Sequence, residues 1–242
     1  FFINISHEIR TPMSLIISPL QQLMAKDKDA ECRKLYSTIQ RNAERILQLV
    51  NQLMDIRKID KGQMSLMFKK AEIVSFTRDL LETFEQQTRV KKLDLKFHTS
   101  APEIEMWIDP KNFDKIILNL LSNACKFTPE NGQVEISLST GEDTHLPQNA
   151  PLRRYVELTV ADSGIGIAST EREHIFERFY QIRNSQNNSN IGTGIGLHLT
   201  RSLVELHYGN IHVEDNGEGR PGSRFIIRLP LGNGHLKKEE IE

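Results

Sequence analysis

Apolar residues follow a regular spacing across residues 31–61, and this is the clearest pattern in the chain. They recur at alternating steps of four and three residues, with one polar interruption: Leu35, Ile39, Asn42, Ile46, Leu49, Leu53 and Ile56. This heptad seam predicts a long helix that packs against a partner helix. A second seam with nearly the same rhythm comes before it, at Ile5, Ile9, Met13, Ile16, Leu20 and Leu23.

The short charged stretch AKDKDAE separates the two seams, so the pattern predicts two antiparallel helices joined as a hairpin. One hairpin buries only part of two apolar stripes. We therefore expect two copies of the chain to form a four-helix bundle, which makes the protein a homodimer through the hairpin. The rhythm stops at Lys61 and Gly62, which gives a first domain over residues 1–62.

Beyond Gly62 the pattern changes to alternating strands and helices. In chain order these are a strand at SLMFKK, a helix at EIVSFTRDLLETFEQQT, strands at LDLKFHT and EMWID, a helix from Pro110 to about Phe127, strands at QVEISLS and RYVELTVA, a helix at 196–208, and strands at IHVED and RFIIRLPL. Interleaved helices and strands predict an α/β layered domain, here over residues 63–232. The charged residues 233–242 are predicted to be a tail or linker.

Composition narrows the possible partners. The chain has 242 residues, of which 38% are hydrophobic and 26% charged, with a formal net charge of −1. This balance is typical of a globular protein and gives no electrostatic reason to expect nucleic acid as a partner. No apolar run approaches the roughly 20 residues of a membrane span. The chain begins with Phe1 rather than Met, so we expect a piece of a longer protein.

The helix that begins at Pro110 carries the first candidate site. One face is apolar, and the other carries Lys115, Asn119, Asn123 and Lys126. Asn disfavours a helix interior because its amide competes for backbone hydrogen bonds. Amide oxygens suit a hard cation and an ammonium group suits phosphate, so this face is a candidate nucleotide site. The alternative is an ordinary solvated face.

A second candidate site follows the strand that ends at Asp162. A carboxylate there can accept a hydrogen bond from an exocyclic amine such as that of adenine. Gly164 and Gly166 come just after it, and glycines let a flat ring approach the backbone. The alternative is a simple tight turn, because Asp-Ser-Gly is common turn chemistry.

A third candidate site lies before the helix at 196–208. An Asn- and Ser-rich stretch, predicted to be a mobile loop, ends at Gly192, Gly194 and Gly196. Glycine-rich backbone that leads into a helix N-terminus can bind an anion. The spacing is not that of the dinucleotide fingerprint. The chain has no P-loop sequence and none of the catalytic motifs of Ser/Thr/Tyr kinases.

The order of these motifs is more specific than any one of them. H-E-I-R-T-P, N-L-L-S-N-A-C-K-F-T-P, D-S-G-I-G-I, F-E-R-F-Y and G-T-G-I-G-L resemble the H, N, G1, F and G2 boxes of sensor histidine kinases, from residue 2 to about 231. The resemblance implies a two-layer α/β sandwich of the histidine-kinase/gyrase ATPase (Bergerat) type behind the hairpin, with ATP and Mg²⁺ as cofactors. Hybrid kinases, which carry a fused receiver domain, share these boxes.

By this resemblance, His7 attacks the γ-phosphoryl group of ATP, Glu8 takes the proton from the other ring nitrogen, and Thr11 places a water for dephosphorylation of the partner. Imidazole suits the attack because it is nucleophilic when neutral. A zinc site of the H-E-x-x-H kind is excluded because position 11 is Thr. Pro12 removes a backbone donor from the helix, which favours a kink beside His7.

The resemblance also assigns the nucleotide site. Asn123 is the expected Mg²⁺ ligand and Asn119 a contact near the phosphates. Lys126 would contact phosphate and Asp162 the adenine amine. The segment expected under the phosphates consists of Gly192, Thr193, Gly194, Gly196 and Leu197, while Gly164 and Gly166 admit the ring. Phe176 and Phe179 either dock the ATP lid or are core aromatics, and Arg178 between them is expected to face the γ-phosphate.

The predicted function is therefore ATP-dependent autophosphorylation on His7 and transfer to an aspartate of a response-regulator receiver domain, fused or separate. Phosphatase activity toward that partner is compatible with this assignment. The alternatives are a gyrase- or chaperone-type ATPase and a scaffold that binds nucleotide without catalysis. The resemblance implies a cytoplasmic fragment of a protein anchored in the bacterial inner membrane, with membrane contact only through an upstream segment.

Overall fold

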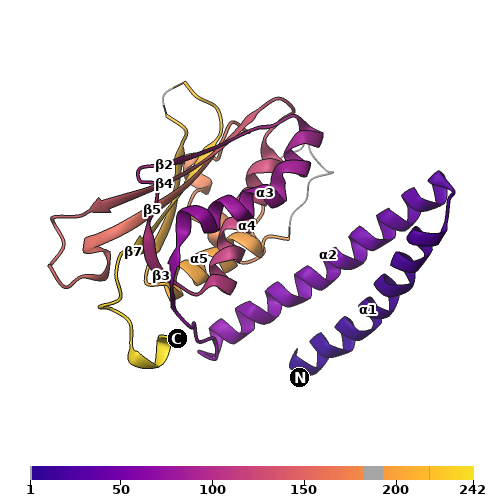
Figure 1. Cartoon of the computed structure of the whole chain (residues 1–242), viewed down its shortest axis with the longest axis horizontal. Coiled ribbons are helices and arrows are strands. Elements are labelled where there is room, and N and C mark those ends of the chain that lie inside the picture. The colour runs from indigo at the N-terminus through magenta and orange to yellow at the C-terminus, as the bar shows by residue number, and fades with distance from the viewer. Residues whose placement is uncertain (1, 183–192, 218) are drawn as a thin grey trace. The chain divides into compact units, whose positions relative to one another are not determined.

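The computed structural model describes residues 2–182, 193–217 and 219–242, with the backbone alone for residues 2–7, 86 and 87. The chain divides into two compact units, Phe1–Met64 and Ser65–Glu242. Figure 1 shows the first as two helices and the second as a sheet with helices. None of the helices in the described ranges has the length and apolarity of a membrane span.

The first unit is an antiparallel hairpin of α1 (Phe2–Lys26) and α2 (Ala30–Asp60). Helix α2 begins where it does because the carboxylate of Asp29 accepts hydrogen bonds from the backbone N–H groups of Glu31 and Cys32, at 2.8 and 3.2 Å. The hydroxyl of Tyr36 donates to Asp27 at 3.0 Å, which ties the turn to α2. The predicted hairpin is confirmed.

The apolar seam of the hairpin is only partly covered within one chain. Leu20, Ala43 and Ile56 are buried. Other seam residues keep 40–60% of their surface exposed, namely Ile16, Leu23, Leu35, Ile39, Ile46 and Leu53. Burying this remaining apolar surface would be favourable, which is the physical basis for a second copy.

The second unit is built on a five-stranded sheet in the order β2-β4-β5-β7-β6. Its strands are β2 (Asp94–Thr99), β4 (Gln133–Glu142), β5 (Arg154–Asp162), β7 (Ser223–Pro230) and β6 (Asn210–Asp215). Strand β2 runs parallel to β4, and the other neighbours are antiparallel. A two-stranded antiparallel sheet pairs β1 (Lys69–Glu72) with β3 (Glu105–Ile108).

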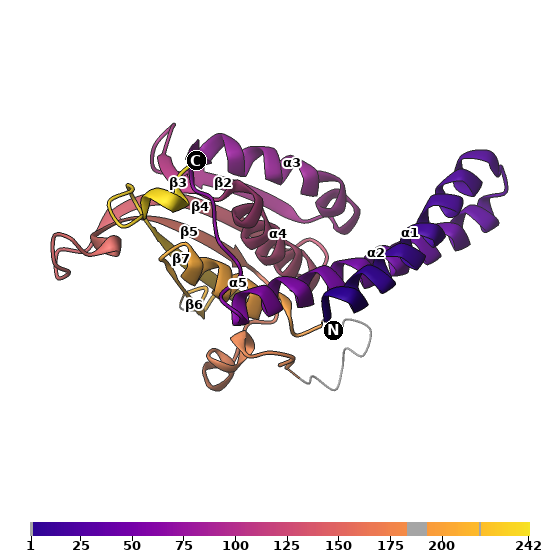
Figure 2. The ribbon, with the colours of Figure 1, turned by 90° about the horizontal axis from the view of Figure 1, so that it is seen from below.

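Three helices cover one face of the five-stranded sheet: α3 (Ile73–Lys91), α4 (Pro110–Phe127) and α5 (Gly196–Leu206). Figures 1 and 2 show them on the same side of the sheet. The core lies between these layers, where Ile116, Leu120 and Leu121 of α4 and Ile136 and Leu158 of the sheet are all at most 2% exposed. The predicted two-layer α/β sandwich is confirmed.

Single 3-10 turns lie at η1 (Pro151–Arg153), η2 (Ser169–Glu171), η3 (His174–Phe176) and η4 (Lys238–Glu240). The stretch SLMFKK, predicted as a strand, becomes extended in a ladder only from Lys69, and the helix predicted at EIVSFTRDLLETFEQQT runs on to Lys91.

The last ten residues, for which charge predicts a tail or linker, contact the second unit. The N–H of Phe68 donates to the carbonyl of Glu240 at 2.6 Å, and the N–H of Glu242 donates to the carbonyl of Phe68 at 3.0 Å. The hydroxyl of Tyr208 donates to the Glu240 carboxylate at 2.9 Å. Residues 240–242 therefore form a short parallel bridge beside the segment that follows α2 in the chain.

Candidate functional site

Helix α4 is fixed at its start by Asp109. The side chain accepts a hydrogen bond from the N–H of Asn112 at 3.1 Å, as an N-cap does, and Pro110 occupies the first turn. The other carboxylate oxygen accepts from the N–H of Met67 at 3.0 Å, and the N–H of Asp109 donates to Nε2 of His207 at 3.3 Å. Asp109 therefore caps α4 and also joins this helix to the end of α5.

The polar face of α4 lies against α5. The amide of Asn119 donates to the hydroxyl of Thr200 at 2.8 Å, and Asn119, Asn123 and Lys126 are each partly buried. A solvated face is therefore the wrong interpretation for Asn119. A Cβ at Gly196 would clash with the Oδ1 of Asn119, so the first residue of α5 has to be glycine for the two helices to approach this closely.

The C-terminal end of α4 is held by a lysine of α3. The ammonium group of Lys91 donates to the backbone carbonyls of Cys125, Lys126 and Thr128 at 2.7, 3.0 and 2.6 Å. A cation at a helix C-terminus also interacts favourably with the helix dipole. The ammonium of Lys126 lies 4.7 Å from the centre of the Phe127 ring. Lys91 thereby positions the end of α4 that carries Lys126.

Asp162 is a buried carboxylate at the end of β5, with 5% of its surface exposed. The hydroxyl of Ser223 donates to it at 2.6 Å and the N–H of Gly164 at 2.8 Å. Burial raises the pKa of Asp162 above its usual value although both hydrogen bonds favour the charged form. A carboxylate has further lone pairs, so Asp162 can still accept a hydrogen bond from a ligand amine.

The backbone after Asp162 is a close-packed turn. A Cβ at Gly164 would lie 2.6 Å from the carbonyl oxygen of Phe127, and Gly166 has φ of +72°. The contact from the Gly164 N–H to the carboxylate is the hydrogen bond of an Asx turn. The tight turn is therefore present, and it brings the end of α4 next to Asp162, while the contact with adenine stays a prediction.

The segment before α5 contacts the F box through its backbone. The N–H of Phe179 donates to the carbonyl of Gly194 at 2.8 Å, and both residues have positive φ, +63° and +67°. The hydroxyl of Thr193 accepts from the N–H of Ile195 at 3.3 Å. Helix α5 begins without a side-chain cap, which leaves its first N–H groups for an anion. Gly192 lies outside the described residues.

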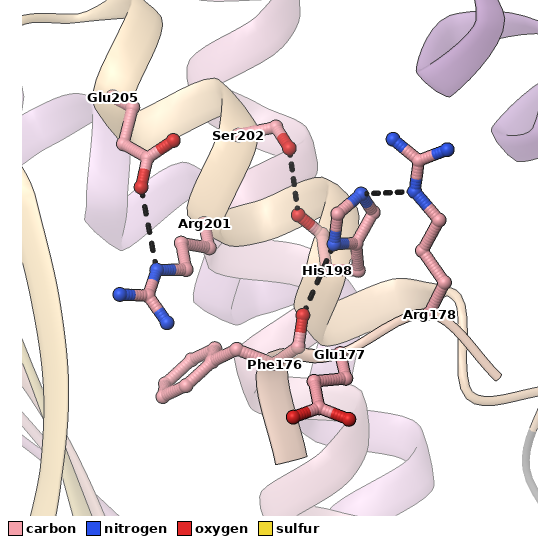
Figure 3. Close-up of a pocket in the computed structure, with 7 residues that line it drawn as sticks. All are labelled: Phe176, Glu177, Arg178, His198, Arg201, Ser202 and Glu205. Carbon is pink, nitrogen blue, oxygen red and sulfur yellow. Dashed lines mark hydrogen bonds and ion pairs between the residues drawn. The ribbon is translucent and has the colours of Figure 1, made fainter. Parts of the chain in front are cut away.

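The two phenylalanines of the F box differ. Phe176 is 4% exposed and meets Phe225 edge-on, with ring centres 6.3 Å apart. Phe179 is 64% exposed, so it is no core aromatic. Between them, Nε of Arg178 donates to Nε2 of His198 at 2.8 Å (Figure 3). The pocket in that figure also contains Glu177, Arg201, Ser202 and Glu205.

The residues present fit a magnesium nucleotide. Mg²⁺ keeps several waters and takes few protein oxygens, so the amide oxygen of the partly buried Asn123 on α4 suffices as a protein ligand. Phosphate fits Lys126 and the uncapped start of α5. The carboxylate of Asp162 has lone pairs beyond those used by Ser223 and Gly164, so it also fits an amine donor.

Two domain families match this chain. The His Kinase A (phospho-acceptor) domain matches residues 1–62, and the Histidine kinase-, DNA gyrase B-, and HSP90-like ATPase domain matches residues 108–233. The chain belongs to the sensor histidine kinases. The fold and family predicted from the order of the five boxes are therefore confirmed.

The relatives are histidine kinases over the whole length of this chain. Histidine kinase P4 of Formosa agariphila is 34% identical over 247 residues, which cover 100% of this chain and 17% of that protein. Sensor histidine kinase TmoS of Ectopseudomonas mendocina is 38% identical over 233 residues, covering 96% of this chain and 23% of that protein. This chain therefore spans less than a quarter of the length of both curated relatives.

A solved structure agrees at the level of the fold. Full-length ShkA in complex with AMPPNP superposes with a TM-score of 0.74 at 25% identity, over 96% of this chain and 45% of that chain. AMPPNP is an ATP analogue, so the second unit of this histidine kinase has the fold of an ATP-binding domain.

The H box of the histidine kinase lies on α1. The backbone of His7 is helical, and its side chain lies outside the described atoms, so the assignment of its imidazole stays a prediction. Glu8 and Thr11 are exposed. Arg10 donates to Oδ1 of Asn51 at 2.9 Å, which links the H box to α2. Helix α1 continues through Pro12.

Several contacts of this histidine kinase site were missed by the sequence reasoning: Thr200 on Asn119, Ser223 on Asp162, Lys91 at the end of α4, and His198 on Arg178. Each joins residues that are 20 or more positions apart in the sequence, so no local spacing reveals it. Ser223 faces Asp162 only because β7 pairs with β5 in this register.

Proposed function

We propose that this core transfers the γ-phosphoryl group of ATP to His7 and then to an aspartate of a response-regulator receiver domain. The observation that carries the proposal is the combination in one chain of a phospho-acceptor hairpin and a domain that has both a buried carboxylate, Asp162, and a helix start without a side-chain cap. Neither a gyrase-type ATPase nor a nucleotide scaffold needs the hairpin.

Nucleotide recognition is assigned to the end of β5 and to α4. Asp162, held by Ser223 and Gly164, accepts the adenine amine. Lys126 and the first N–H groups of α5 bind phosphate, Asn123 holds Mg²⁺, and Asn119 lies near the phosphates. When bound, Mg²⁺ neutralises charge on the phosphate oxygens. Arg178 faces the γ-phosphoryl group in this assignment, because guanidinium groups suit its spread charge.

The chemical step is assigned to the H box. One nitrogen of the neutral His7 imidazole forms the P–N bond while the bond from the γ-phosphorus to the bridging oxygen breaks, and ADP leaves. The proton on the other ring nitrogen passes to Glu8. Thr11 lies one turn along α1 and holds a water when the phosphorylated partner is hydrolysed.

The partners are a second copy and a receiver domain. The exposed seam of the hairpin, Leu35, Ile39, Ile46 and Leu53 among others, supports a homodimer through a four-helix bundle, since that arrangement buries these residues. The receiver, fused or separate, supplies the aspartate that accepts the phosphoryl group from His7.

The test is phosphorylation of the chain with γ-labelled ATP and Mg²⁺ beside a His7→Gln variant. We expect acid-labile, base-stable label in the native chain and none in the variant, and transfer of the label to a receiver domain added afterwards. An Asp162→Asn variant separates nucleotide binding from chemistry. ATP hydrolysis without protein-bound label would support an ATPase instead, and label that survives in His7→Gln would exclude His7 as the nucleophile.

A further inference from the structure

His198 lies in the first turn of α5, and its ring joins this helix to the F box. Nδ1 lies 3.0 Å from the carbonyl oxygen of Phe176, and Nε2 lies 2.8 Å from Nε of Arg178 (Figure 3). Both ring nitrogens are therefore engaged by the same three-residue stretch. No motif in the sequence assigns a role to this histidine.

The two contacts determine which ring nitrogen carries the proton. The Nε–H of an arginine can only donate, so Nε2 of His198 accepts through its lone pair. A backbone carbonyl can only accept, so Nδ1 of His198 carries the hydrogen that it donates to Phe176. The arrangement requires the neutral, Nδ1-protonated form of the imidazole.

This hydrogen bond orients the guanidinium group of Arg178. Because Nε of Arg178 is hydrogen-bonded to the His198 ring, the plane of the guanidinium group is fixed relative to α5. Figure 3 shows the guanidinium group beside the imidazole, with the dashed line from Nε to the ring. A long, exposed side chain otherwise samples many rotamers, and its orientation before the reaction lowers the entropic cost of the transition state.

A separate contact holds α5 to the F box. The guanidinium carbon of Arg201 lies 5.3 Å from the centre of the buried Phe176 ring, and Arg201 pairs with Glu173 at 3.6 Å. Changes at position 198 therefore remove the link to Arg178 without removing the packing of the helix on this turn. Variants of His198 are expected to fold.

We propose that His198 is a positioning residue that holds the guanidinium group of Arg178 for phosphoryl transfer. The inference deepens the proposed function and rests on it, because there Arg178 faces the γ-phosphoryl group. The adenine contact at Asp162 lies on other elements, so His198 acts on the rate of transfer and not on nucleotide affinity.

Three variants of position 198 separate the two contacts. In His198→Gln the amide reaches the place of Nε2 and can accept from Arg178. The amide of His198→Asn reaches only the place of Nδ1, and His198→Ala retains neither contact. We expect the autophosphorylation rate at saturating ATP to fall about tenfold in His198→Asn and His198→Ala, with KM for ATP unchanged. In His198→Gln we expect the native rate. Ser202→Ala is the matched control, since that hydroxyl donates only to the backbone carbonyl of His198.

The hydrogen bond between His198 and Arg178 can also be detected without measuring kinase activity. Nitrogen-15 NMR of the His198 ring should show the Nδ1-protonated tautomer in the native chain and a loss of this preference in Arg178→Ala. The Nε2-protonated tautomer in the native chain would overturn the inference. In the kinase assay, His198→Ala should add nothing to Arg178→Ala, because both remove the same interaction.

The two proposals fail in different ways. If Arg178→Ala slows autophosphorylation and His198→Ala does not, the positioning role is wrong and the role of Arg178 stands. If the NMR signature is present but Arg178→Ala phosphorylates His7 at the native rate, the assignment of Arg178 to the γ-phosphoryl group is wrong, and with it the inference.

Discussion

At the scale of single residues, the candidate nucleotide site depends on polar groups whose cost is offset by specific partners. Asp162 is nearly fully buried, yet it receives hydrogen bonds from Ser223 and Gly164. Burial still raises the pKa of its carboxyl group, so the charged form is less favourable in the folded chain than in the unfolded chain. A buried carboxylate whose charged form lowers the stability of the folded chain indicates a binding role for Asp162.

The substitution Asp162→Asn tests whether Asp162 lowers stability while it contributes to ATP binding. The pKa of Asp162 is higher in the folded chain than in the unfolded chain. The free energy of unfolding therefore falls as pH rises from the unfolded pKa to the folded pKa, and it stays at the lower value at neutral pH. The isosteric amide can accept from the Gly164 N–H through its oxygen and donate to the Ser223 hydroxyl through its nitrogen. We expect unchanged or higher thermal stability at neutral pH and ATP binding weakened about tenfold or more. Thermal melts and calorimetric ATP titrations measure both; a destabilised variant would contradict the assignment.

Gly196→Ala is a steric test at the start of α5. A Cβ there would clash with Oδ1 of Asn119, so the helix start must shift and strain the contact from Asn119 to Thr200. We expect weaker ATP binding together with a loss of roughly 1–3 kcal/mol in stability, as for other overpacked sites. Gly234→Ala is the control, because nothing lies within 4 Å of its Cβ position. Equal behaviour of the two variants would show that this close approach is not required.

At the scale of elements, periodicity in the sequence was sufficient for most helices and strands, and the helix predicted from Pro110 to about Phe127 matches α4. That success has a physical cause, since the buried face and the caps of α4 are set by residues within the helix or next to it. The site is different. Thr200, Ser223 and His198 act on residues from other elements, and strand register and helix packing had to be known before they could be assigned.

The junction of α3 with α4 offers a test at this scale. Lys91→Met removes three hydrogen bonds from an ammonium group to carbonyls at the end of α4. We expect a loss of about 2–3 kcal/mol in the unfolding free energy of the second unit, because bonds to charged donors are the stronger ones. Urea unfolding can be followed by the fluorescence of Trp107, the single tryptophan of the chain, which lies in this unit.

Lys92, the neighbour of Lys91 in the sequence, supplies the control for Lys91→Met. Lys92 pairs with Glu130 at 2.8 Å, but both side chains are more than half exposed, at 68% and 57%. Exposed pairs contribute little, so Lys92→Met should change stability by less than about 0.5 kcal/mol. Equal losses in the two variants would mean that loss of positive charge, and not the capping of α4 by Lys91, explains the effect.

At the scale of the whole molecule, the least predictable feature was the end of the chain. Charge and composition describe residues 233–242 as a tail, yet it is held by two backbone hydrogen bonds to Phe68, by the Tyr208 hydroxyl on the Glu240 carboxylate and by an ion pair of Lys69 with Glu242. Backbone pairing of this kind is independent of composition. Phe68 is 1% exposed and meets His207 edge-on, with ring centres 5.4 Å apart. The segment after α2 and the chain end therefore share one cluster with the end of α5.

Deletion of residues 237–242 tests whether this cluster orders the segment that follows α2. The deletion removes the acceptor of the Phe68 N–H, so we expect its amide hydrogen to exchange at least about fivefold faster, since a lost hydrogen bond is worth about 1 kcal/mol or more. Tyr208→Phe is the control, because it removes the hydroxyl bond to Glu240 and keeps the backbone bridge. Protection at Phe68 should fall in the deletion and change little in Tyr208→Phe. Unchanged protection in the deletion would mean that Phe68 is held by its ring contacts alone, and that the chain end is attached to this segment without ordering it.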